Sequence, residues 1–84
     1  MNRTRLHALR KSFGDAIRAA RLQAGLSQEA LAARADIHRN YVGDVENGRK
    51  NICIGNMFKV SAALGVPLSE LVAATEKRHP AAEK

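Results

Sequence analysis

Residues 27–48, SQEALAARADIHRNYVGDVENG, contain two short helical segments separated by a tight turn. Ser27 is a favourable N-cap, and the apolar pattern that follows it predicts a helix over about 28–34. The next residues are polar except for one apolar anchor, Ile37, and a second helix is expected over 39–46. Two helices this short, joined by so tight a turn, cannot lie flat against each other. We therefore expect them to cross steeply, with the second helix projecting from the surface.

Three further helices are predicted around this pair. The first has apolar residues at spacings of three and four, begins either near Leu6 or near Ser12, and ends at Gly25. A fourth helix is expected within 53–65, and a fifth over about 68–74, directly after a proline. No strand-like alternation is present in the sequence. The pattern predicts an all-α bundle of five short helices.

The length of 84 residues is enough for one small domain. We expect that domain over 12–75, with 1–11 as a basic extension or the start of the first helix, and 76–84 as a flexible tail. No apolar run approaches the ~20 residues that span a bilayer, and the basic N-terminus lacks the apolar stretch of a secretory signal. These features predict a cytoplasmic protein.

Positive charge is placed on both sides of the central pair of helices. Six basic residues and one acidic residue occur in 1–24, and three basic residues with no acidic one occur in 49–65. The intervening 25–48 has two basic and four acidic residues, within a total net charge of +6. This arrangement suits a polyanion held on both sides of a central element that reads it, although a solvated basic surface would have the same composition.

Enzyme and metal chemistry find little support in the sequence. The single cysteine, Cys53, and three scattered histidines do not make a zinc site, and no nucleophile–base set or phosphate loop is present. We therefore expect no catalytic residue, no metal, no cofactor and no small-molecule ligand. Cys53 lies at the N-cap of the fourth helix, where it is interpreted as a partly buried, inert thiol, with a redox switch as the alternative.

The second helix of the central pair has a small, polar outer side. At about 100° per residue this side consists of Asn40, Gly43, Asp44 and Asn47, with Arg39 at its edge. Such a helix fits the major groove of B-DNA, where Arg39 can bond guanine, Asn40 adenine and Asp44 cytosine, while Gly43 permits close approach. Taken alone, however, a polar outer face is more typical of a solvated helix.

Four motifs in order make the pattern more specific. They are GLSQEALA at 25–32, YV at 41–42, ENGR at 46–49 and ALGV at 63–66. Together they resemble the Cro/C1-type (XRE-like) helix-turn-helix family over about residues 12–73. The resemblance implies a five-helix, lambda-repressor-like DNA-binding domain that forms a homodimer and binds double-stranded DNA at palindromic operators.

A narrower resemblance is carried by IHRNYV at 37–42 and RKNI at 49–52, which are similar to the controller proteins of restriction-modification systems. It implies a transcriptional regulator of restriction-modification genes. The alternative is an antitoxin-like regulator or a protein-interaction module on the same fold, although only residues 75–84 remain for a partner-binding segment.

The resemblance also implies roles for individual residues. The base-reading set comprises His38, Arg39, Asn40, Gly43 and Asp44. The residues expected to contact the DNA backbone are Ser27, Gln28, Tyr41, Asn47, Arg49, Lys50 and Asn51. For Tyr41, the alternative to a phosphate contact is a ring that packs at the edge of the domain. His38 replaces the usual Ser, Thr or Asp cap. Instead of contacting a base, it could cap its helix or contact a phosphate.

Two other sets are expected to have structural roles. Glu46 lies on the apolar side of its helix, so its charge needs a partner, and the resemblance implies that this partner is Arg21. The pair would set the angle of the recognition helix. On the fifth helix, Leu68, Leu71 and Val72 form an apolar face that one domain is not expected to bury, which predicts the dimer interface.

Overall fold

The computed structural model describes residues 1–78 as five α-helices, with no strand among them. The helices are α1 (Arg3–Gln23), α2 (Gln28–Ala35), α3 (Arg39–Glu46), α4 (Ile54–Leu64) and α5 (Leu68–Arg78). The all-α, five-helix architecture is thus confirmed. No single helix in this part of the chain is long and apolar enough to cross a membrane; α4 and α5 reach the length and composition together but are bent by 104°.

The first helix begins earlier than either start expected from the sequence. The side chain of Asn2 accepts a hydrogen bond from the backbone N–H of Arg5 at 2.8 Å and caps the helix at Arg3. Residues 3–11 are therefore the first turns of α1 rather than a separate arm. Their basic residues therefore extend from one side or the other of a helix that is continuous with the packed part of α1.

The last helix also differs from the expectation, since α5 continues to Arg78 instead of ending near Ala74. Of the tail expected over 76–84, residues 76–78 are helical, and 79–84 lie outside the described residues.

Cys53 is the N-cap of α4, as expected, but it makes no side-chain cap hydrogen bond. Its side chain is exposed, which corrects the interpretation as a partly buried thiol.

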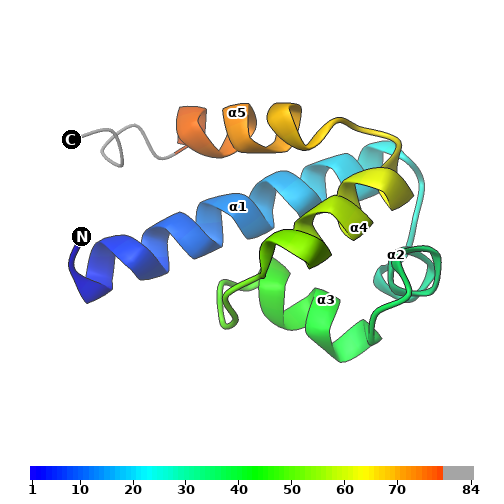
Figure 1. The fold of residues 1–84 in the computed structure, drawn as a ribbon, viewed down its shortest axis with the longest axis horizontal. Coiled ribbons are helices and arrows are strands. Elements are labelled where there is room, and N and C mark those ends of the chain that lie inside the picture. The colour runs from blue at the N-terminus through cyan, green and yellow to red at the C-terminus, as the bar shows by residue number, and fades with distance from the viewer. Residues whose placement is uncertain (79–84) are drawn as a thin grey trace.

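The core lies between the five helices: α1 packs against α5 and α3, and α2 packs against α3 and α4. Figure 1 shows α5 running along one side of α1, with α3 on the other. Ile17 and Leu31 are the largest fully buried side chains, and Leu71 is only 2% exposed. Leu71 therefore belongs to the core of a single domain, which corrects its assignment to an apolar face that the domain leaves open. The register of its helix turns Val72 outward instead.

A glycine allows α1 and α3 to approach closely. A Cβ atom at Gly14 would lie 2.6 Å from the carbonyl oxygen of Glu46 and closer still to that of Val45. Both oxygens are backbone atoms at the C-terminal end of α3. Any side chain at Gly14 would thus push α3 away from α1, so this glycine fixes the depth at which the recognition helix is seated.

Candidate nucleic-acid interface

Local hydrogen bonds define the turn between α2 and α3. The Ser27 hydroxyl accepts from the backbone N–H of Ala30 at 3.0 Å and caps α2. After α2, the backbone N–H of Ile37 bonds to the Ala32 carbonyl at 3.0 Å, which closes the turn. The Nδ1 atom of His38 then accepts from the backbone N–H of Asn40 at 3.1 Å. The structure thus gives His38 a capping role at the start of α3, with its side chain exposed.

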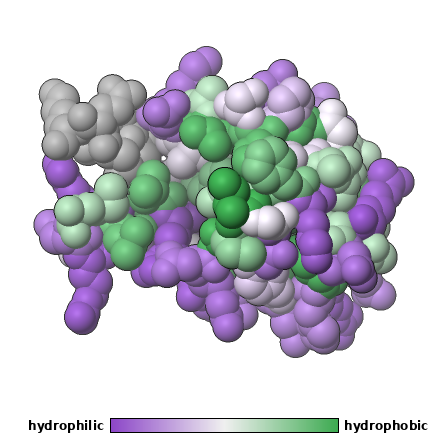
Figure 2. Space-filling model, in the orientation of Figure 1, coloured by the Kyte–Doolittle hydropathy of each residue, from purple (hydrophilic) through white to green (hydrophobic). Residues whose placement is uncertain are grey.

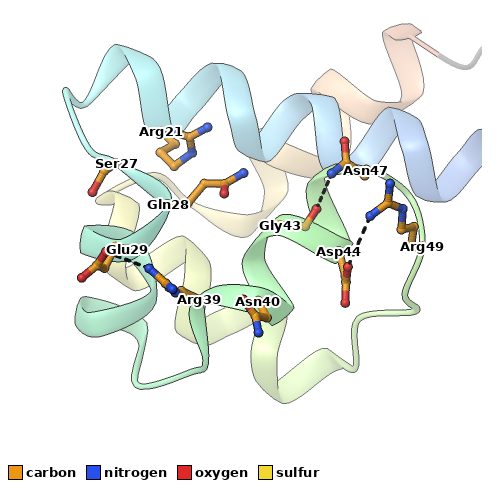
Figure 3. Close-up of a pocket in the computed structure, with 10 residues that line it drawn as sticks. All are labelled: Arg21, Ser27, Gln28, Glu29, Arg39, Asn40, Gly43, Asp44, Asn47 and Arg49. Atoms are coloured by element: carbon orange, nitrogen blue, oxygen red, sulfur yellow. Dashed lines mark hydrogen bonds and ion pairs between the residues drawn. The ribbon is translucent and has the colours of Figure 1, made fainter.

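The two sides of α3 differ as the helical period predicts. Val42, Val45 and Glu46 are buried. The opposite side faces a hollow between α2 and α3, where Arg39, Asn40 and Asn47 are exposed and Gly43 and Asp44 are half-buried (Figure 3). The structure therefore brings the expected base-reading residues of α3 together on one accessible surface.

Three contacts connect side chains within this surface. Arg39 Nη1 lies 3.3 Å from Glu29 Oε2, and Arg49 Nη1 lies 3.8 Å from Asp44 Oδ1. Asn47 donates to the Gly43 carbonyl at 2.9 Å. Exposed ion pairs of this kind contribute only about 0–1 kcal/mol, so the arginines can exchange them for contacts with bases or phosphates.

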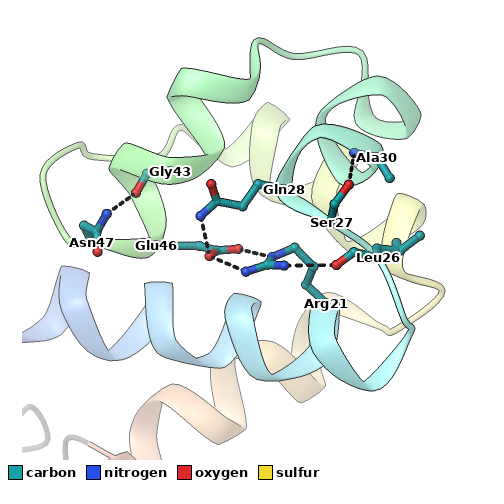
Figure 4. Close-up of polar contacts among 8 residues, drawn as sticks. All are labelled: Arg21, Leu26, Ser27, Gln28, Ala30, Gly43, Glu46 and Asn47. Atoms are coloured by element: carbon teal, nitrogen blue, oxygen red, sulfur yellow. Dashed lines mark hydrogen bonds and ion pairs between the residues drawn. The ribbon is translucent and has the colours of Figure 1, made fainter.

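A buried polar cluster connects α1, α2 and α3 behind the exposed side (Figure 4). Arg21 Nε and Nη2 donate to the two carboxylate oxygens of Glu46 at 2.7 and 3.0 Å. Gln28 Nε2 donates to Glu46 Oε1 at 3.0 Å, and Arg21 Nη1 donates to the Leu26 carbonyl at 2.9 Å. Arg21 is 7% exposed and Glu46 2%, so this is a buried, bidentate pair with a third partner.

The surroundings of Arg21 favour its charged form. The hydrogen bonds that Arg21 donates to Glu46 raise the pKa of the Arg21 guanidinium above its ordinary value, burial opposes that rise, and the negative charge of Glu46 adds to it. A charged pair in a buried site is costly when one member is lost, because the other then has no counter-charge. The cluster can therefore hold α3 at a fixed angle but offers no free group for catalysis.

The residues expected at the DNA backbone surround this surface in different environments. Ser27, Arg49, Lys50 and Asn51 are exposed, whereas Tyr41 is half-buried against the core. Gln28 turns its amide toward Glu46, so its side chain braces the recognition helix. Asn51 Oδ1 accepts from Arg10 Nη1 at 3.1 Å, which connects the loop after α3 to α1.

Several residues of this region were not identified from the sequence. The sequence could have pointed to Gly14, since a glycine inside a helix is unfavourable unless another element approaches closely. No sequence pattern indicates the contact between Arg10 and Asn51. Ile54 and Phe58 of α4 are 69% and 58% exposed, and the helical period alone does not indicate whether such apolar residues are covered.

The fold and this surface define a class of protein. Residues 17–71 match the helix-turn-helix family, and the chain belongs to that family, the Cro/C1-type DNA-binding transcriptional regulators. Its members are regulators rather than enzymes.

Individual relatives can be given with their extents. The chain is 42% identical over 66 residues to control protein C.MunI of Mycoplasma sp, covering 77% of this chain and 89% of that protein. It is 42% identical over 65 residues to control protein C.BamHI of Bacillus amyloliquefaciens, covering 76% and 80%. The crystal structure of the restriction-modification controller protein C.AhdI from Aeromonas hydrophila has 40% identity and a TM-score of 0.73, covering 74% of this chain and 94% of that one.

Proposed function

We propose that this protein is a controller-type transcriptional regulator that binds a palindromic operator as a homodimer and regulates restriction-modification genes in the cytoplasm. The observation that carries the proposal is the pairing of an exposed polar side of α3 with a buried brace behind it. Arg39 and Asn40 are exposed on that side, with Arg39 held only by an exposed ion pair to Glu29. Arg21 and Glu46 fix the helix that carries them. The relatives named as control proteins support the restriction-modification role.

In the proposed complex, α3 lies in the major groove. Arg39 and Asn40 are in its first turn, where side chains reach base edges. Arg39 donates two hydrogen bonds to guanine, and Asn40 pairs with adenine. Gly43 lets the helix approach, and Asp44 accepts from cytosine. Arg49 and Lys50 hold the phosphate backbone beside the groove.

The homodimer is proposed to form through an apolar surface on α4 and α5 that consists of Ile54, Phe58, Leu68 and Val72. Of these, Leu68 is half-buried against the core and the other three are exposed. Figure 2 shows apolar residues gathered over α4 and toward α5. Ile54, Phe58 and Val72 are 69%, 58% and 40% exposed, and Phe58, Leu68 and Val72 line one groove. Large apolar side chains clustered in this way are typical of an interface. A two-fold dimer through this surface would place two copies of α3 about one DNA turn, ~34 Å, apart.

The proposal is tested by selecting bound sequences from random duplexes with the wild-type protein. We expect two half-sites related by a two-fold axis and separated by about one helical turn. The control is a duplex of the same composition with the selected sequence scrambled, which should bind much more weakly. Affinity should also fall steeply as salt rises, because phosphate contacts release counterions. Equal binding to every duplex would contradict an operator-specific regulator.

A further inference from the structure

Basic side chains follow the N-terminal half of α1 on the side that faces α3. At about 100° per residue, Arg3 and His7 lie within about 20° of Gly14, and Arg10 and Lys11 within about 60°. Gly14 itself faces the carbonyl oxygens at the end of α3. We name Arg3, His7, Arg10 and Lys11 the α1 ridge.

Two contacts connect the α1 ridge to the loop that follows α3. Arg10 Nη1 donates to Asn51 Oδ1 at 3.1 Å. Lys11 packs so closely on Gly48 that a Cβ there would lie 3.0 Å from the Lys11 Cα. Figure 3 shows the N-terminal half of α1 passing beside Asn47 and Arg49. The α1 ridge therefore begins beside the loop that carries Arg49 and extends away from the recognition helix.

Part of the charge of the α1 ridge has no opposite charge beside it within residues 1–78. Lys11 is paired with Asp15, but neither Arg3 nor Arg10 takes part in an ion pair within residues 1–78. The first turn of α1 has no acidic residue, and Arg3 lies at the positive end of the helix dipole, where a carboxylate rather than an arginine would stabilise the helix. Arg3 thus adds positive potential at a place where helix stability does not require it.

We propose that the α1 ridge binds phosphates of the DNA that flanks each half-site, so that the footprint extends beyond the loop of Arg49 and Lys50. This inference rests on the proposed operator binding. From Arg3 to Lys11 the helix rises about 12 Å, comparable with the axial rise of about three phosphates on one strand. A rigid helix with exposed arginine at its far end matches a polyanion of that spacing, and it reads no base.

The test compares Arg3→Gln with Arg5→Gln. Arg5 is in the same turn and is also exposed, but it lies about 180° from Gly14, on the opposite side of α1. Glutamine and arginine have similar helix propensities, and the Asn2 cap is unchanged, so both variants should unfold at the wild-type temperature. Each protein is titrated with two duplexes: the selected operator with long flanks, and the same operator trimmed to its half-sites.

We expect wild-type protein and Arg5→Gln to bind the long duplex more tightly than the trimmed one. Arg3→Gln should lose most of this difference, and its slope of log affinity against log salt should fall by about 2 per dimer, since each phosphate contact contributes ~0.9. Equal behaviour of Arg3→Gln and Arg5→Gln would overturn the role of the α1 ridge while operator binding stands. If wild-type protein binds the operator no more tightly than unrelated duplexes, the proposed function is wrong, and the inference that rests on it is wrong as well.

Discussion

Replacing Gly14 by alanine tests how the recognition helix is seated. Inside an unobstructed helix, this change stabilises the protein by about 0.8–1 kcal/mol, because alanine is the better helix former. At Gly14 the added Cβ would meet two backbone carbonyls of α3, one at 2.6 Å. A side-chain rotation cannot relieve that contact, so α1 and α3 must separate by about 1 Å to restore an ordinary van der Waals distance.

The expected change in the free energy of unfolding is the cost of overpacking minus the gain in helix propensity. Overpacking of this kind costs typically ~1–3 kcal/mol, and the upper part of the range applies because two backbone atoms are involved. After the gain in helix propensity, the free energy of unfolding should fall by about 1–2 kcal/mol. For a domain of this size, that lowers the melting temperature by about 5–15 °C. Operator affinity should fall as well, because the displaced atoms belong to the recognition helix.

Gly55 is the matched control, since a Cβ there meets nothing within 4 Å. Gly55→Ala should be neutral or stabilising, by at most about 1 kcal/mol. Both variants are compared with the wild type by thermal and urea unfolding followed by circular dichroism. If Gly14→Ala is as stable as Gly55→Ala, the close seating of α3 on α1 is wrong.

Three further predictions concern the buried pair, the α4 cap and the dimer. Arg21→Met and Glu46→Gln should each destabilise the domain by about 3 kcal/mol in urea unfolding, and the double variant by much less than the sum; additive effects would remove the proposed coupling. Cys53→Ser should supply the missing cap of α4 and raise the free energy of unfolding by about 0.5–1 kcal/mol, whereas Cys53→Ala should not. Equal stability of the two variants would refute the cap argument. Phe58→Lys should convert dimers to monomers in sedimentation, while Leu22→Lys, at an equally exposed residue (58%), should leave them intact; a persistent Phe58→Lys dimer would place the interface elsewhere.

The central pair of helices could be predicted closely because its signals are local. Ser27 caps α2 as expected, and α3 has the expected bounds with Val42 and Val45 inward. Capping and the helical period act over a few residues, so they can be identified from the sequence. The inward charge of Glu46 was informative for the same reason, since the helical period placed it beside apolar neighbours.

Features that depend on which helix covers another could not be predicted in this way. The period of α4 and α5 shows which side of each is apolar but not whether another element covers it, so Leu71 was expected on an open face although it lies in the core. The start of α1 could not be placed at Arg3 because residues 2–5 include no apolar residue, and only the cap by Asn2 marks it. The Arg10–Asn51 contact joins residues 41 positions apart, which no local pattern indicates.

Operator preference measured on variants of α3 tests the central claim most directly. Selection from random duplexes is repeated with Arg39→Ala and Asn40→Ala, and with Lys50→Ala as the control that removes a basic loop side chain. We predict that each α3 variant loses discrimination at one position of each half-site, by about 1–3 kcal/mol, because a bidentate base contact is removed. Lys50→Ala should weaken binding to all sequences alike and keep the preferred site. If Arg39→Ala and Asn40→Ala both select the wild-type operator unchanged, α3 does not read the bases through these residues.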